Sequence, residues 1–340
     1  MEGIIRLFTT IAPDFQVLWL AAKDLLTSSN PYQNPQIFTG VGYPPNTLLF
    51  YLPLTIMNYQ LAQNLFTLLS LLSILGIIYL SLNLLKIKPT YILEISIFIV
   101  VIIAFPTKFT LGMGQNNLIT FFLLLLSFYL YLKKNYKWTG IVLGLSFSFK
   151  TIFIYFLIYY ILKKEWKVIV YSILTLILTT IIIYLIRGNL YLYSYYTQVV
   201  LPPLSRFEGR EIYYNQGLSG FISRMVTDID LRKNLTALTS LILISVNAYI
   251  IFTKNKFDLV ISFTIITLLL LDSLAWQHHF VFLIFPFIVL IKYSKSVMSI
   301  IVILSSYVLA AINVPDITFL SSNLFFATLL LYIMNLKYLK

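Results

Sequence analysis

One carboxylate in this chain stands where it could act as a general base. Asp14 follows Pro13 and opens a short amphipathic stretch, residues 14–27. If that stretch lies at a lipid–water boundary, the carboxylate can accept a proton from a hydroxyl group. Asp is also a favoured N-cap, so the residue could simply begin a helix. The sequence leaves both interpretations open.

Two runs carry neutral polar groups that could bind a substrate. Tyr43 lies in Gly42-Tyr43-Pro44-Pro45, which could also be a loop re-entering a membrane. Gln115 and Asn116 lie in the run 112–117, whose amides could bind hydroxyl groups or cap a helix. A third run, Trp276-Gln277-His278-His279, offers imidazoles, although Trp and His are also common interfacial anchors.

The arginines are placed where they could bind a phosphate. Arg is the better bidentate phosphate ligand, and the loops that we expect on the inside contain only Lys. A lipid-linked donor with its phosphate in an outer cavity would explain this placement. Ion pairing with Glu208, Glu211, Asp228 and Asp230 would explain it equally well. The arginines are Arg6, Arg187, Arg206, Arg210, Arg224 and Arg232.

Composition makes the chain a polytopic membrane protein. With 59% hydrophobic residues, 11% charged residues and a mean hydropathy of +0.89, its 340 residues have too few polar groups to cover a soluble globule. The net charge of +12 does not indicate nucleic acid, because short lysine loops beside anionic lipid account for it. Without cysteine the chain forms neither disulfides nor thiolate metal sites. Residues 1–13 lack the apolar core of a cleavable signal peptide.

Hydrophobic runs predict about nine full spans, all helical because lipid tolerates no unpaired backbone. They cover residues 61–84, 91–105, 117–132, 168–186, 235–252, 259–275, 280–291, 297–312 and 323–336.

Lysine clusters between these runs set the predicted orientation. They hold 14 of the 24 basic residues and fall on one side, which the positive-inside trend makes cytoplasmic. The acids from Asp14 to Asp316, both histidines and the arginines then gather mainly at or near the opposite face. The clusters are Lys86/Lys88, Lys133/Lys134/Lys137, Lys163/Lys164/Lys167, Lys254/Lys256, Lys292/Lys295 and Lys337/Lys340.

Residues 138–162 have lysine clusters at both ends and Lys150 at the centre. A single crossing would turn the later lysine loops outward, so we predict a hairpin of two half-helices turning near Lys150. Each arm climbs only roughly 18 Å of a hydrocarbon core about 30 Å thick. Lys150 would lie inside the membrane and need a counter-charge, for which Asp272 or a bound lipid phosphate is available.

Two regions outside the spans complete the predicted single domain, residues 1–340. Residues 1–60 form an outer region whose stretch 14–27 places Phe15, Leu18, Ala22 and Leu25 on one face of a helix too short to span, which predicts an interfacial helix. Residues 188–234 form a long, tyrosine-rich outer loop folded against the membrane.

The order of these motifs resembles that of glycosyltransferase family 87, polytopic GT-C enzymes that include the phosphatidylinositol-mannoside mannosyltransferases. The resemblance covers most of the chain, and only the order is specific because each motif is short. The motifs are Asp14-Phe15, Asn30-Pro31-Tyr32, Tyr43-Pro44-Pro45, Gly114-Gln115-Asn116-Asn117, Gly144 to Lys150, Asn215-Gln216 with Ser219, and Trp276-Gln277-His278-His279.

The resemblance implies a GT-C-type helical bundle in the cell membrane. It implies transfer of a hexose, often mannose, from a polyprenyl-phosphate donor to a lipid or glycan acceptor on the extracytoplasmic face, with Asp14 as the matching base. By the same match, Asn215, Gln216, His278 and His279 fall in the substrate site. The chain departs from the family in lacking a full span before Asp14 and in reading Lys150-Thr151 where the family has Lys-Pro.

We therefore expect an inverting glycosyltransferase that needs no metal or other cofactor, because phosphate is already a fair leaving group. A lipid-linked glycan polymerase or ligase is the nearest alternative and would not need Asp14. A transporter is less consistent with polar residues gathered on one face. The residues expected to bind substrate are Tyr43, Gln115, Asn116, Lys150, Arg206, Arg210, Asn215, Gln216, His278 and His279.

Overall fold

The structure is a computed structural model that describes residues 2–27, 29–37, 40–314 and 320–340. Its regular elements within these ranges are helices, apart from one isolated antiparallel bridge between Asn215 and Trp276. The all-α prediction is therefore confirmed. Asp316, expected on the outer face, lies outside the described residues.

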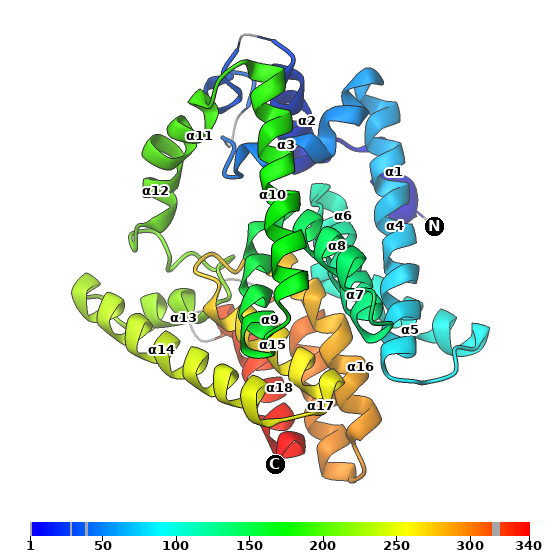
Figure 1. Ribbon diagram of the computed structural model, residues 1–340. Helices are drawn as coiled ribbons and strands as arrows, with labels where there is room; N and C mark the ends of the chain where they lie inside the picture. Colours follow the sequence, from blue (N-terminus) through cyan, green and yellow to red (C-terminus); the bar gives the residue numbers. More distant parts are fainter. Residues whose placement is uncertain (1, 28, 38–39, 315–319) are drawn as a thin grey trace. The chain divides into compact units, whose positions relative to one another are not determined.

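Figure 1 labels the helices in chain order, and every predicted hydrophobic run coincides with one of them. The longer helices are α2 (Pro13–Leu25), α4 (Tyr59–Leu84), α5 (Tyr91–Ile103), α7 (Asn117–Leu132), α8 (Tyr136–Phe149), α10 (Trp166–Arg187), α14 (Ile229–Thr253), α15 (Phe257–Leu271), α16 (Ile284–Tyr293), α17 (Val297–Ala311) and α18 (Asn323–Leu339). The shorter ones are α1 (Glu2–Thr9), α3 (Pro45–Tyr51), α6 (Phe105–Met113), α9 (Leu157–Leu162), α11 (Tyr191–Tyr195), α12 (Leu201–Ser205) and α13 (Leu218–Met225).

Helix length reduces the number of candidate spans below the nine predicted. In the described residues, four helical segments are long and apolar enough to cross a membrane: α4, α10, α14 and Leu320–Leu339. The pair α5 and α6, bent by 71°, makes a fifth if it is one broken span. A 15-residue helix such as α15 reaches only roughly 22 Å, short of a core about 30 Å thick. The membrane class is thus supported with four or five spans, and nine full spans are not confirmed.

The chain divides into two compact units. Unit 1 contains Met1–Ile74, Thr110–Phe153 and Lys167–Arg206, and unit 2 contains Leu75–Phe109, Ile154–Trp166 and Phe207–Lys340. Each unit contains three separate segments of the chain, so no single boundary in the sequence divides them. The single-domain organisation stays a prediction.

Helix α2 lies in the hydrophobic core of unit 1. Phe15, Leu18, Ala22 and Leu25 are all buried, which confirms the predicted apolar face. Trp19 joins them, and its indole N–H donates to the carbonyl of Leu54 at 3.1 Å. The burial explains why this short helix is stable, and its interfacial location stays a prediction.

Two glycines bring α8 and α10 together in unit 1. A Cβ on Gly140 would lie 2.6 Å from the carbonyl oxygen of Val168, and one on Gly144 would lie 2.6 Å from the Cβ of Thr175. Small residues four positions apart allow such close approach of membrane helices. Ser172 uses this proximity to donate to the carbonyl of Gly140 at 3.1 Å.

The core of unit 2 is built around α15. Every side chain from Leu259 to Leu270 is buried, and the helix packs against α14, α16 and α18. Asn247 of α14 and Asn335 of α18 donate to the hydroxyls of Thr264 and Ser262, at 3.1 and 2.6 Å. A helix surrounded in this way does not need the length of a full span.

The helix break predicted near Lys150 is confirmed. α8 ends at Phe149, and Lys150 has an extended backbone with φ −142° and ψ 93° before a 3₁₀ turn leads to α9. The two arms fall in different units, so the hairpin itself stays a prediction.

The predicted loop 188–234 is largely helical. It contains α11, a π-helical turn (Tyr196–Val200), α12, α13 and the first residues of α14. Helix α14 begins at Ile229, earlier than the predicted span, because the Asp228 side chain accepts the backbone N–H of Leu231 at 2.7 Å. Asp228, expected as an ion-pair partner of the arginines, is a helix cap.

Candidate functional site

Asp14 is not the N-cap of its helix. The capping position belongs to Ala12, Pro13 occupies the first helical position, and Asp14 falls in the first turn of α2. Its Oδ2 accepts a hydrogen bond from the side-chain amide of Gln115, a residue distant in sequence. The capping alternative therefore fails, and the carboxylate faces a tertiary partner.

The start of α2 is fixed by two neighbouring segments of unit 1. Gln63 of α4 accepts the backbone N–H of Ala12 at 3.0 Å, and Tyr59 donates to the same Gln63 oxygen at 2.6 Å. Gly114 approaches from the other segment, with φ +71° and so little room that a Cβ would lie 2.6 Å from the Cβ of Phe15. These contacts set where the Asp14 carboxylate lies relative to Gln115.

Four predicted residues form one connected cluster in unit 1. The side-chain nitrogen of Gln115 lies 2.6 Å from Oδ2 of Asp14, and its oxygen accepts the Tyr43 hydroxyl at 2.9 Å. The Lys150 ammonium donates to the Tyr43 hydroxyl at 3.2 Å and lies 5.3 Å from the centre of the same ring. Asp14, Gln115, Tyr43 and Lys150 are thus brought together, although the sequence did not predict their contact. Their contacts are to one another, and their contact with a substrate stays a prediction.

Burial controls the charge state of Asp14. Burial raises the pKa of this carboxyl above its ordinary value, while the hydrogen bond from Gln115 and the positive charge of Lys150 lower it. Since burial has the larger effect, the pKa of Asp14 is raised. A carboxylate with a raised pKa is a stronger base than a solvated one, which suits proton abstraction.

Lys150 has partners that differ from the predicted one. The side chain is only 4% exposed, and Tyr43 and the charge of Asp14 act on it within unit 1. Asp272, the expected protein counter-charge, instead binds Nδ1 of His279 at 2.8 Å. The sequence favoured Asp272 because of its expected depth in the membrane. The contact between α2 and residues 114–116, which brings Asp14 near Lys150, is tertiary and has no local sequence pattern.

Asn116, next to Gln115 in the chain, holds the segment that carries Lys150. Its side-chain amide donates to the carbonyl of Phe149 at 3.1 Å, which holds the end of α8 where Lys150 begins. Its Oδ1 is buried and has no hydrogen-bond partner among the described residues. Asn116 therefore positions Lys150, and its buried oxygen leaves one acceptor for a water or a substrate group.

A second cluster of predicted residues lies in unit 2. Nδ1 of His279 contacts Asp272 at 2.8 Å, and the ring packs beside Phe282. Arg210 is 5% exposed and lies over the Phe207 ring at 4.1 Å. Burial lowers the pKa of Arg210, and the charges of Asp272 and Glu208 oppose that shift, so the guanidinium stays protonated. The cluster provides one cationic side chain, Arg210, and an oriented imidazole, His279, both of them largely buried.

Asn215 and Gln216 make hydrogen bonds that stabilise the fold. Asn215 donates to the carbonyl of Ser273 at 3.1 Å, and its backbone pairs with Trp276. Gln216 donates to the carbonyl of Ser321 and accepts the backbone N–H of Leu324 at 3.1 Å. These side chains tie the segment after α12 to α18, and substrate binding by them stays a prediction.

His278 is enclosed by aromatic rings. Its ring lies 5.7 Å from Phe109 and is parallel to Trp276 at 6.5 Å. The geometry therefore separates the two neighbours: His279 is oriented by a carboxylate, whereas His278 packs between rings.

Three arginines stabilise the fold. Arg187 donates to the carbonyl of Asp24 in the last turn of α2 and to that of Thr27, which follows the helix. Arg224 donates to the carbonyl of Asn215 at 2.8 Å, and Arg232 pairs with Glu211 at 3.0 Å. Arg206 at the end of α12 is exposed. Of the six predicted phosphate ligands, Arg6, Arg206 and Arg210 remain candidates.

Two further tyrosines support the site, and only Tyr51 belongs to no motif found in the sequence. Tyr51 is fully buried, its ring lies 6.0 Å from that of Phe15, and its hydroxyl has no hydrogen-bond partner among the described residues. Tyr32, whose Asn-Pro-Tyr motif was visible, donates its hydroxyl to the carbonyl of Tyr43 at 2.9 Å and so holds the Tyr43 loop.

Among the described residues, no group of three His, Cys, Asp or Glu side chains could hold a metal ion. The sequence does contain an Asp-x-Asp spacing at Asp228 and Asp230. Asp228 caps α14 and Asp230 lies 3.4 Å from Lys233, so each has a local structural role.

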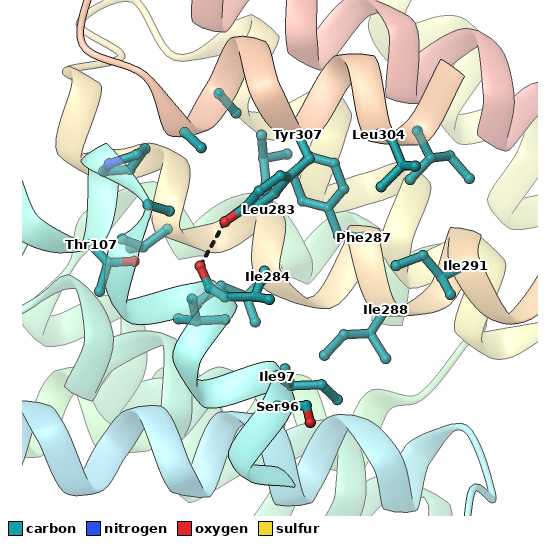
Figure 2. A pocket seen from close by; sticks show the side chains of 18 of the residues that line it. Ser96, Ile97, Thr107, Leu283, Ile284, Phe287, Ile288, Ile291, Leu304 and Tyr307 are labelled. Carbon is teal, nitrogen blue, oxygen red and sulfur yellow. Dashed lines mark hydrogen bonds between the residues drawn. The ribbon is translucent and has the colours of Figure 1, made fainter. Parts of the chain in front are cut away.

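Unit 2 also contains an apolar cavity of about 490 Å³. Figure 2 shows side chains of α5, α16 and α17 along it, including Ile97, Ile288 and Leu304. Tyr307 crosses it and donates its hydroxyl to the carbonyl of Val100 at 2.7 Å. An apolar lining offers water no hydrogen bonds, so the cavity suits a hydrocarbon chain.

The chain matches the model of glycosyltransferase family 87 over residues 41–275. The match contains Tyr43, Gln115, Lys150 and Arg210, whereas Asp14 precedes it and His279 follows it. None of the curated proteins compared with the chain matches it. Because the matched region covers more than half of the chain and several of its helices are apolar enough to span, the protein belongs to glycosyltransferase family 87 and is a membrane glycosyltransferase.

Proposed function

We propose that the enzyme transfers a hexose, with mannose as the first candidate, from a polyprenyl-phosphate donor to a hydroxyl of a lipid or glycan acceptor. The observation that carries the proposal is the Asp14 carboxylate, which is partly buried, bound through Oδ2 by Gln115 and raised in pKa. This is the environment of a general base that works near neutral pH. The reaction site is on the extracytoplasmic face in this proposal.

The chemical step is a single displacement. Asp14 takes the proton of the acceptor hydroxyl as that oxygen attacks the anomeric carbon. The bond from the anomeric carbon to the phosphate oxygen breaks, and the lipid phosphate leaves with the electron pair. The configuration at the anomeric carbon is therefore inverted.

Charge develops on the departing phosphate, and cationic or hydrogen-bonding groups would stabilise it. From the family resemblance, we assign this task to Arg210 and His279. Arg210 is protonated and buried against Phe207, and Asp272 orients the His279 ring. Arg206 is an exposed third candidate. The apolar cavity of unit 2 would take a hydrocarbon chain of one lipid substrate.

The test compares two carboxylates of the same helix. Membranes containing wild type, Asp14→Asn or Asp24→Asn are incubated with radiolabelled polyprenyl-phosphate mannose or glucose, and released lipid phosphate and labelled product are measured. Asp24 is the matched control, because its carboxylate accepts a local hydrogen bond from Asn34 at 2.7 Å. Asp14→Asn should lose about 10²–10⁴-fold in rate, and Asp24→Asn should stay near wild type.

Full turnover by Asp14→Asn would remove Asp14 from the mechanism and favour the polymerase or ligase class. Transfer from neither labelled donor by the wild type would contradict the proposed donor class. Transfer from the glucose donor alone would correct the sugar while retaining the mechanism.

A further inference from the structure

We propose that Lys150, Tyr43 and Gln115 form a directed hydrogen-bond relay that keeps Asp14 ionised and oriented, so that they are positioning residues for the base. The inference deepens the proposed function and rests on Asp14 being that base. It assigns the three residues a task other than the substrate binding expected from sequence.

The direction of each hydrogen bond follows from donor chemistry. The Lys150 ammonium has only donors, so the Tyr43 oxygen must accept at 3.2 Å. The Tyr43 hydroxyl hydrogen is then directed to Oε1 of Gln115 at 2.9 Å, which leaves the Gln115 nitrogen facing Oδ2 of Asp14 at 2.6 Å. Rotating the Gln115 amide would set its oxygen against a carboxylate, so an ionised Asp14 fixes the amide.

Each of the three hydrogen bonds is therefore donated in the direction of Asp14. The positive charge of Lys150 lies at the opposite end of the chain of bonds. Hydrogen bonds in such a chain polarise one another, and burial strengthens the effect. Lys150 and Gln115 are 4% and 5% exposed, so solvent screens the relay little. Lys150 thus stabilises the negative charge of Asp14 both across space and through Tyr43 and Gln115.

The relay also selects which carboxylate oxygen can react. Oδ2 is taken by Gln115, whereas Oδ1 makes no hydrogen bond with the described residues. An acceptor hydroxyl would deliver its proton to Oδ1. Without Gln115 the carboxylate could rotate, and the fraction of productive encounters would fall.

Other titratable groups near Asp14 are tyrosines. Tyr51 from α3 and Tyr43 interact electrostatically with each other, and Asp14 acts on Tyr51. Tyr59 from α4 lies against Phe15 with ring centroids 5.8 Å apart. Lys150 is the charged group that acts on Asp14, and it lowers the pKa of the carboxyl.

The first experiment measures kcat/KM of the full-length enzyme against pH for wild type, Lys150→Met and Tyr43→Phe. Removal of the Lys150 charge makes Asp14 harder to ionise, so the acidic limb moves to higher pH and kcat/KM falls on the order of tenfold on that limb, recovering as pH rises. Tyr43→Phe keeps both the lysine charge and the ring but breaks the relay. We expect a smaller shift in the same direction.

Matched controls remove the same groups away from the relay. Lys23→Met deletes an exposed charge of α2 that lies over Trp19 at 4.5 Å. Tyr193→Phe deletes a hydroxyl that donates to Asn46 at 3.0 Å in the same unit. Both should keep the wild-type pH profile.

The second experiment needs no turnover. Carbodiimide modifies protonated carboxyls, and peptide mass spectrometry reports modification of Asp14 at each pH. Lys150→Met should be labelled up to a higher pH than wild type. Unchanged labelling and unchanged pH profiles in both relay variants would overturn the relay. A raised KM for the donor with an unshifted pH profile would also overturn it and would assign Lys150 to phosphate binding. An active Asp14→Asn enzyme contradicts the proposed function instead, and the labelling still reports on the relay.

Discussion

Nδ1 of His279 lies 2.8 Å from Oδ2 of Asp272, with side-chain exposures of 9% and 15%. The other oxygen of Asp272 accepts the backbone N–H of Leu274 at 3.2 Å, which fixes the carboxylate plane. An ionised carboxylate accepts, so Nδ1 carries a hydrogen and the ring is held in one orientation. His279 is therefore held by a carboxylate, whereas the ring of its neighbour His278 packs against aromatic rings.

We predict that Asp272→Asn lowers kcat/KM for the donor by about 10–100-fold, because a charged hydrogen bond of about 1.5–3 kcal/mol no longer orients the ring. The change should be measured with the labelled donor at fixed acceptor, together with the thermal midpoint of the detergent-solubilised enzyme. Asp258→Asn is the control, since Asp258 pairs with Lys292 at 3.0 Å elsewhere in unit 2. Equal activity of the two variants would contradict an orienting role for Asp272.

Gly114→Ala should destabilise the protein by about 1–3 kcal/mol and reduce transfer. The new methyl group would lie 2.6 Å from the Cβ of Phe15 and 2.9 Å from the Cβ of Ala12, atoms that cannot move without their backbones. Gly188→Ala is the control for the cost of the backbone conformation alone. Gly188 also has φ +71°, but a Cβ there would have no atom within 4 Å. Denaturation of both variants should show Gly114→Ala as the less stable one. If the two match, the clash with α2 is relieved at little cost.

Tyr51→Phe should stabilise the protein while revealing whether the hydroxyl serves the reaction. The group is fully buried and has no hydrogen-bond partner among the described residues, an arrangement that costs about 1–3 kcal/mol. Removal of the oxygen leaves the ring packed on Phe15 and Phe66. We expect a higher thermal midpoint. A lower midpoint would show that the hydroxyl has a bound partner such as water.

Local features of the site were predictable from sequence. The apolar periodicity of residues 14–27 gave the buried face of α2, and lysine clusters around an apolar stretch gave the break at Lys150. Each depends on residues close together in the chain. Pro106, in the first turn of α6, is a sequence signal for the bend between α5 and α6.

The contacts that define the cluster were not predictable in the same way. Asp14, Gln115 and Lys150 meet because Gly114 packs on α2 and Asn116 holds the end of α8, and no periodic pattern encodes those contacts. The count of spans failed for a related reason. Hydropathy reports that α15 is apolar, but a helix buried among α14, α16 and α18 is apolar without being a full span.

The lysine turns give a direct test of membrane orientation. The chain has no cysteine, so single cysteines can be introduced without background labelling. Lys134 and Lys164 are exposed and follow the C-termini of α7 and α9, with φ 59° and 58°. In the hairpin arrangement both are cytoplasmic, and a membrane-impermeant thiol reagent should label Lys134→Cys and Lys164→Cys only in inverted vesicles. Asp230→Cys, in the predicted outer region, should label only from the outside. Labelling of positions 134 and 164 from opposite sides would show that residues 138–162 cross the membrane once and would turn Lys254 and Lys295 outward.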